Sequence, residues 1–262
     1  MKIIRQKGQV ALIVLVISAL ALTLGLSLSD KIRSGVKISK DDELLQKAFD
    51  AAESTLDNYY ARQEETYTSS TNDAFGSLST SPIVGTTIPF SKYVRSDEYA
   101  FFWLVGHEDN GEINYGQVYD SNDLTICYNT FTEGGLLVYY FYRDGSSYEV
   151  TRSAYNLSGG YFGAEGLTGS GGSQCPGYDS YFRYTLSPDP TMVTPLLLIV
   201  KPVGGGSNFM VSGGNFPSQG NTLDALGTSG TANAPIKEEN RWDPTKYMFF
   251  MLEGIVSQST IN

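Results

Sequence analysis

The stretch KGQVALIVLVISALALTLGLSLSD, residues 7–30, decides how this chain is organised. From Val10 to Leu28 it carries no charged side chain, and these nineteen residues approach the roughly 20 that span a bilayer as an α-helix. The cations of the leader, Met1 to Gly8, precede the span, and the first acid, Asp30, follows it. The positive-inside bias then keeps the N-terminus in the cytoplasm and exports the rest. The sequence therefore predicts a single-pass membrane protein with transmembrane segment 10–28 and an extracytoplasmic bulk.

The junction between leader and apolar stretch is a glycine, at Gly8-Gln9. An ordinary secretory signal instead ends a shorter apolar region in a small-residue cleavage site and is discarded. Residues 1–8 with the following stretch resemble the class III leader of type IV pilins and type II secretion pseudopilins. In that superfamily a prepilin peptidase cuts after the glycine and then methylates the new N-terminus. The resemblance implies cleavage between Gly8 and Gln9, N-methylation of Gln9, and retention of the apolar segment.

A second motif lies further along the first quarter of the chain. The residues Ala48-Phe49-Asp50-Ala51-Ala52-Glu53 resemble the A-F-x-A-A-E element in the N-terminal helix of PilX-type minor pilins and K-type tip pseudopilins. The matched positions are Ala48, Phe49, Ala51, Ala52 and Glu53. The resemblance implies an α+β protein in which a long N-terminal helix packs on a globular head.

One position departs from the pattern of major pilins, which carry a glutamate at the fifth mature residue. Here that residue is Ile13. In lipid an unpaired charge costs several kcal/mol, so such a glutamate would neutralise the N-terminal ammonium of the next subunit. A subunit with Ile13 can offer its own ammonium but cannot receive one, and we expect it near the filament tip. The alternative is that Ile13 marks a divergent or non-filament membrane anchor.

The helical pattern continues past the apolar stretch. Apolar residues recur at spacings of three and four from Leu45 to Tyr60, with charged residues between them, which predicts an amphipathic helix. Joined to the membrane segment, one helix would run over 9–62 and measure roughly 80 Å. Gly25 and Gly35 are expected places for bending or local melting. The apolar positions expected to face the head are Leu45, Ala48, Phe49, Ala52, Leu56, Tyr59 and Tyr60.

The rest of the chain predicts an irregular connection and then a β-rich head. Residues 63–95 are rich in Thr, Ser, Gly and Asn and show little periodicity. Residues 96–262 alternate aromatic and β-branched runs with turn clusters, which favours an antiparallel sheet. Asp144-Gly145 predicts a hairpin over 136–155, because type I′ turns need positive φ at both central residues. The other expected strands are 99–105, 113–119, 124–130, 181–186, 196–203 and a closing run over 246–253, with a glycine-rich loop over 158–176.

Cys127 and Cys175 are the only cysteines, an even number in a chain routed outside the cytoplasm, where disulfides persist. A bridge would tie a strand to the glycine-rich loop and stabilise the fold by about 3–4 kcal/mol. The alternative is two unpaired thiols, one buried in a strand and one in a loop.

The sequence offers little for catalysis, so we expect no enzyme and no cofactor. His107 is the single histidine, and its turn-rich surroundings favour a solvated loop residue over a catalytic one. No Cys/His metal spacing and no phosphate-binding glycine loop is present. The acidic loops 108–112 and 120–123 carry oxygen ligands suitable for calcium, but neither follows EF-hand spacing.

These features predict a structural subunit, a minor pilin or pseudopilin near the tip of a type IV pilus-like or type II secretion filament. Its partners would be other pilin subunits, the prepilin peptidase and the inner or cytoplasmic membrane. The head would contact a surface, a glycan, DNA or a secreted substrate, and the sequence does not choose among them; its net charge of −10 argues against broad phosphate-driven DNA binding by this subunit. Two alternatives remain: a signal-anchored extracellular adhesin or binding module, and a secreted soluble protein such as a hydrolase.

Overall fold

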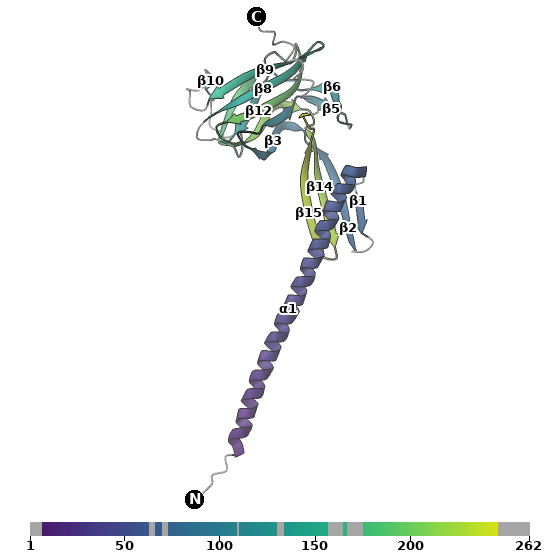
Figure 1. The fold of residues 1–262 in the computed structure, drawn as a ribbon, viewed down its shortest axis with the longest axis vertical. Coiled ribbons are helices and arrows are strands. Elements are labelled where there is room, and N and C mark those ends of the chain that lie inside the picture. Colours follow the sequence, from purple (N-terminus) through teal and green to yellow (C-terminus); the bar gives the residue numbers. More distant parts are fainter. Residues whose placement is uncertain are drawn as a thin grey trace. The chain divides into compact units, whose positions relative to one another are not determined.

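A computed structural model describes residues 7–62, 66–69, 73–108, 110–129, 134–156, 165–166 and 175–245. The chain is α+β, as predicted: one long N-terminal helix and a set of β-sheets that are almost wholly antiparallel (Figure 1). It divides into two units, Met1–Ser79 with Asp224–Lys237, and Thr80–Leu223 with Glu238–Asn262.

The helix α1, Lys7–Arg62, is continuous over 56 residues, which confirms the predicted joining of the apolar and amphipathic parts (Figure 1). The expected local melting at Gly25 and Gly35 is wrong, because both lie within the continuous helix. A glycine costs about 1 kcal/mol in a helix interior. The rest of the helix is rich in Leu, Ala and Lys, which favour helix, so these two costs do not interrupt it.

The first unit contains the helix and a four-stranded sheet in the order β1-β2-β14-β15. Strand β1 pairs antiparallel with β2, with Thr66 opposite Ser77. Gly230 has a φ of 56° in the turn between β14 and β15, a conformation that favours glycine. The strands are β1 (Thr66–Ser69), β2 (Ala74–Pro82), β14 (Gly220–Ser229) and β15 (Ala232–Arg241).

The second unit is built on two further sheets and a ribbon. A five-stranded sheet has the order β10-β9-β8-β12-β4, a four-stranded sheet has the order β11-β7-β13-β3, and β5 pairs with β6. The short β10 runs parallel to β9, and the other neighbouring strands described in this unit pair antiparallel. The strands are β3 (Gly85–Val94), β4 (Ala100–Trp103), β5 (Val105–His107), β6 (Ile113–Val118), β7 (Asp123–Tyr128), β8 (Gly135–Asp144), β9 (Ser147–Asn156), β10 (Glu165–Gly166), β11 (Ser180–Thr185), β12 (Thr194–Val203) and β13 (Ser207–Phe216).

The hairpin predicted at Asp144-Gly145 is confirmed. Strands β8 and β9 are each ten residues long and pair from Asp144 opposite Ser147 to Gly135 opposite Asn156. Gly145 has a φ of 57°, as the turn requires.

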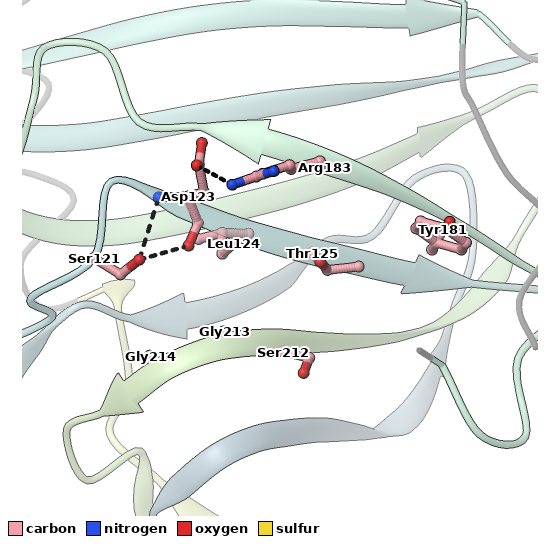
Figure 2. A pocket seen from close by; sticks show the side chains of 9 residues that line it. All are labelled: Ser121, Asp123, Leu124, Thr125, Tyr181, Arg183, Ser212, Gly213 and Gly214. Atoms are coloured by element: carbon pink, nitrogen blue, oxygen red, sulfur yellow. Dashed lines mark hydrogen bonds and ion pairs between the residues drawn. The ribbon is translucent and has the colours of Figure 1, made fainter. Parts of the chain in front are cut away.

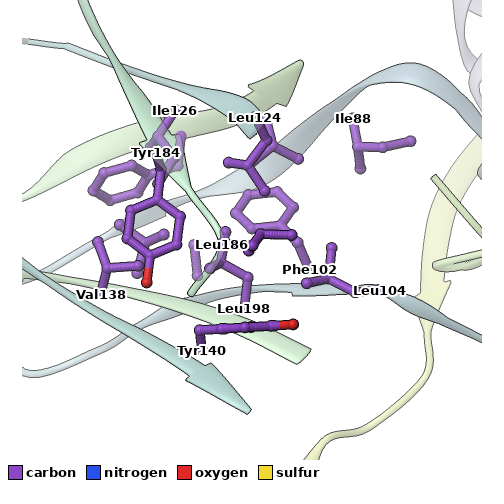
Figure 3. Close-up of a cluster of buried hydrophobic side chains, with 14 of the residues drawn as sticks. Ile88, Phe102, Leu104, Leu124, Ile126, Val138, Tyr140, Tyr184, Leu186 and Leu198 are labelled. Carbon is purple, nitrogen blue, oxygen red and sulfur yellow. The ribbon is translucent and has the colours of Figure 1, made fainter. Parts of the chain in front are cut away.

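The core of this unit lies between the five-stranded and four-stranded sheets (Figure 3). Strands β8 and β12 supply Val138, Tyr140 and Leu198, while β7 supplies Leu124 and Ile126. Because successive strand residues point to opposite faces, the residues between them, such as Thr125 and Cys127, lie on the outer face of the four-stranded sheet.

The irregular connection predicted for 63–95 is wrong over most of its length, since β2 and β3 occupy 74–82 and 85–94. The prolines that favoured a loop are tolerated for positional reasons: Pro82 ends β2, and Pro89 lies on β3, an edge strand of its sheet. The sequence analysis also missed β13 and β14, which are rich in Gly, Ser and Asn, and β15, which is rich in charged residues and Asn. The expected closing run 246–253 and most of the glycine-rich loop 158–176 lie outside the described residues.

Candidate functional site

The lower half of α1 exposes an unbroken apolar surface. The large hydrophobic side chains between Leu12 and Leu28 are 51% to 71% exposed. An 18-residue window of this helix has a mean hydropathy of 2.5, and none of it is buried within the protein. Within the described part of the chain, this is the one helix long and apolar enough to cross a membrane. Removing apolar surface from water is favourable by about 25 cal/mol for each Å². Contact with lipid or with other helices would therefore stabilise this half of α1.

The residues that carry the processing resemblance lie at the start of the same helix. Gly8 and Gln9 belong to the first turn of α1, which has no acidic residue. Ile13 follows one turn later, and its side chain is 55% exposed. No carboxylate lies on α1 before Asp30. The apolar half of the helix therefore carries no acidic side chain.

The A-F-x-A-A-E element divides between two faces of α1. Ala48, Ala51 and Ala52 are buried against the sheet, whereas Phe49 is 42% exposed and Glu53 faces solvent. The predicted docking stripe is thus right for its alanines and Leu56 and wrong for Leu45, Phe49 and Tyr60, which are exposed. Residues spaced by three and four can lie on either of two adjacent faces of a helix, so the spacing alone does not show which face is buried. In α1 the face with the small side chains packs against the sheet.

The partners of these alanines are glycines that the sequence analysis did not single out. Gly76 of β2 lies against Thr55 and the backbone of Ala51, and Gly227 of β14 lies against the carbonyl group of Ala48. Thr55 is itself buried, and its hydroxyl donates to the Ala51 carbonyl oxygen at 2.7 Å. Helix and sheet therefore meet through small residues on both sides.

The disulfide between Cys127 and Cys175 is present, with the two Cα atoms 5.8 Å apart. Both cysteines are fully buried, and they pack with Met210, Tyr178 and Tyr181. Because Cys127 points to the outer face of the four-stranded sheet, the bridge fixes the segment that begins at Cys175 onto that face.

A polar hollow of about 650 Å³ lies on the same outer face (Figure 2). Strand register places Arg183 opposite Thr125, Thr125 opposite Ser212, and Ser212 opposite Thr87. We call these four side chains the polar row. The Thr87 and Ser212 hydroxyl oxygens are 3.4 Å apart. The sequence separates these positions widely, so only the sheet brings them together.

Asp123 fixes one end of the hollow (Figure 2). Its carboxylate accepts from the Thr185 hydroxyl at 2.6 Å and from Arg183 Nη2 at 2.5 Å. These two hydrogen bonds hold the pKa of Asp123 below its usual range. The Ser121 hydroxyl donates to the Asp123 carbonyl oxygen at 3.1 Å. The carboxylate and the guanidinium therefore neutralise each other.

His107 is not the solvated loop residue that we expected. It belongs to β5, its ring is stacked 5.3 Å from that of Trp242, and it meets the edge of Trp103 at 4.4 Å between centroids. Desolvation lowers its pKa to about 4. The turn-forming residues around His107 led to the prediction of a loop, because β5 is only three residues long and gives no clear strand pattern.

The acidic loops considered for calcium have other contacts. Glu108 and Glu112 close a turn through a backbone hydrogen bond of 2.8 Å, and Asp123 is paired with Arg183. Within the described ranges, no three His, Cys, Asp or Glu side chains gather as a metal site would need.

Comparison with known proteins finds no match to a family model, to a curated protein or to a solved structure.

Proposed function

We propose that this chain is a structural subunit of a type IV pilus-like or type II secretion filament, assembled through its N-terminal helix after removal of the leader. The observation that supports this proposal best is the contrast between the two halves of α1. Its first half is apolar and unburied, and its second half docks through Ala48, Ala51 and Ala52 on a sheet of the same unit. A helix of this kind can exchange lipid for neighbouring helices while remaining fixed to a folded domain.

In this proposal the prepilin peptidase cuts between Gly8 and Gln9, and Gln9 becomes the methylated first residue. The absence of a carboxylate at Ile13 favours a place at the tip, because this subunit has nothing to pair with the ammonium of another subunit in the lipid-like filament core.

N-terminal mass spectrometry of the mature chain tests the proposal. Expression beside an active prepilin peptidase should yield a chain that begins at methylated Gln9, and a peptidase-deficient host should retain Met1. The chain should also be recovered with sheared filaments. An intact Met1 in the presence of the peptidase would indicate a signal-anchored adhesin, and a chain beginning at Asp30 would indicate a secreted protein; either result would refute the filament role.

Substitution at Ile13 tests the tip position separately. Ile13→Glu supplies the missing carboxylate, so we expect more copies of the subunit per filament than in the wild type. Ile13→Leu is the matched control and should leave the number unchanged. Equal copy numbers for all three chains would contradict the tip position without affecting the processing result.

A further inference from the structure

The outer face of the four-stranded sheet carries two hollows, one beside β7 and one just beyond the end of that strand. The first, of about 650 Å³, includes Asp123 and Thr125, and the second, of about 260 Å³, includes Asn129. The disulfide at Cys127 lies between them. At about 3.3 Å per strand residue, Thr125 and Asn129 are roughly 13 Å apart. The face therefore suits an elongated ligand that reaches from one hollow to the other.

The first hollow has the hydrogen-bonding groups that recognise hydroxyl-rich ligands. Thr125 and Ser212 each carry a hydroxyl that can donate and accept, and the Ser121 oxygen, whose hydrogen is donated to the Asp123 carbonyl oxygen, remains an acceptor. The guanidinium of Arg183 is 73% exposed at the side-chain level and keeps donors beyond the one used by Asp123. Arg183, Thr125 and Ser212 come from the three neighbouring strands β11, β7 and β13 (Figure 2).

The charge of the hollow excludes two other ligand classes. Arg183 is balanced by Asp123 at 2.5 Å, so no free cation is left to attract a phosphate or sulfate. The one carboxylate in the lining is occupied by Thr185 and Arg183, whereas a calcium ion needs six to eight oxygen ligands. The lining is polar and close to electrically neutral.

Aromatic rings complete both hollows. Tyr181 borders the first and Tyr178 the second, and both pack against the disulfide cluster. The Tyr178 hydroxyl donates to the carbonyl oxygen of Phe209 at 3.2 Å, which holds its ring in place. A tyrosine held in this way offers a flat apolar surface beside hydrogen-bonding groups, which matches the mixed character of a sugar ring. The second hollow adds the amides Asn129 and Asn208.

We infer that this face binds a neutral oligosaccharide of several sugar units, which contacts Thr125, Ser212, Arg183 and Tyr181 in the first hollow and reaches Asn129 and Tyr178 in the second. The strands fix the side chains before binding, because the polar row is set by backbone register and Asp123 is held by two neighbours. Sites on strands hold their geometry more closely than sites on loops. The inference does not depend on filament assembly.

The test uses the full chain in detergent and an array of neutral oligosaccharides built from glucose, galactose, mannose or N-acetylhexosamines. The best array ligand is then titrated by calorimetry as its disaccharide and its hexasaccharide. We expect binding of at least one neutral hexasaccharide, with the disaccharide at least about tenfold weaker.

Substitutions test whether the ligand binds to this outer face of the four-stranded sheet. Thr125→Val keeps the shape of the strand residue and removes one hydroxyl, so binding should weaken about fivefold. Tyr181→Ala should weaken it about tenfold or more. Tyr115→Ala on β6 is the control, since it also truncates a tyrosine with an accessible ring but borders neither hollow, and it should bind as the wild type does. If Thr125→Val unfolds at the same temperature as the wild type, its weaker binding is not caused by a loss of folded protein.

Three results would overturn the inference. The first is an array on which no neutral oligosaccharide binds. A neutral ligand whose affinity is the same in Thr125→Val and Tyr181→Ala would bind elsewhere. Binding of sulfated oligosaccharides alone, lost in Arg183→Gln, would assign an anionic ligand.

Discussion

Gly227 of β14 lies directly against the carbonyl oxygen of Ala48 on α1, with no room for a Cβ between strand and helix. Gly76 of β2 repeats the relationship, because a Cβ there would come within 2.6 Å of the Ala51 carbonyl oxygen. Strands β2 and β14 are neighbours in the sheet. The docking of α1 therefore depends on two adjacent strand glycines as much as on the helix alanines.

Gly227→Ala should destabilise the docking of α1 by about 1–3 kcal/mol, because the helix must move away to admit the methyl group. Thermal unfolding of the full chain in detergent and limited proteolysis after residue 62 measure the effect. Gly35→Ala is the control, since a Cβ at Gly35 meets nothing within 4 Å. Equal stability of the two variants would show that the sheet yields at Gly227 without cost.

The same glycines show where reading the sequence succeeds and fails. Val10–Leu28 and Asp144-Gly145 are local signals, one of hydrophobicity and one of turn chemistry. The first lies in a helix long and apolar enough to cross a membrane, and the second forms the predicted hairpin. Gly227 and the Gly213-Gly214 pair of β13 look like loop residues because glycine is rare in strand interiors. Their presence in strands follows from long-range packing, since Gly227 admits α1 and Gly214 donates its N–H to the Tyr119 hydroxyl at 2.9 Å.

The candidate sites show the same limit. Cys127 and Cys175 could be considered as a pair because the chain has no other cysteine and is predicted to be exported. The polar row could not be found, because Thr87, Thr125, Arg183 and Ser212 share no motif. Their proximity is a consequence of strand order and register alone.

Removing the hydroxyl group from each of two buried tyrosines should change the stability of the folded chain in opposite directions. The Tyr119 hydroxyl donates to the Asp123 carbonyl oxygen at 2.8 Å and accepts from Gly214 N at 2.9 Å, so Tyr119→Phe should cost about 1–3 kcal/mol. The Tyr140 hydroxyl is buried with no hydrogen-bond partner among the described residues, so Tyr140→Phe should stabilise by about 1 kcal/mol. Denaturant unfolding of both variants compares them directly. A loss of stability in Tyr140→Phe equal to that in Tyr119→Phe would show that the Tyr140 hydroxyl has a partner.

Removal of the disulfide should lower the free energy of unfolding by about 3–4 kcal/mol, because the bridge closes a loop between positions 48 residues apart. The double variant Cys127→Ala, Cys175→Ala should therefore unfold at lower denaturant concentration than the wild type under oxidising conditions. With excess reductant at equilibrium, the wild type should lose most of this advantage. A difference that persists in reductant would assign the effect to the packing of the two sulfur atoms with Met210 rather than to the cross-link.

His107 should make the second unit less stable in mild acid. Its pKa in the folded chain is about 4, below its ordinary value of 6.5, because burial beside Trp103 and Trp242 disfavours the charged ring. The unfolded chain therefore binds one more proton than the folded chain between these values, and stability is lost as the pH falls from about 6.5 to about 4. With each pKa unit worth about 1.4 kcal/mol and with allowance for partial exposure, we expect a loss of about 2 kcal/mol.

Because carboxylates also titrate over this range, the comparison must be made with His107→Phe, which keeps an aromatic ring between the two tryptophans and cannot take up a proton. Denaturant unfolding at pH values between 7 and 4 should show the wild type losing about 2 kcal/mol more than His107→Phe over the interval. Parallel pH profiles for the two proteins would mean that the imidazole is protonated as readily in the folded chain as in the unfolded one. In that case the ring would have to be accessible to water or paired with an acid, and the stacked arrangement with Trp242 would not govern its ionisation.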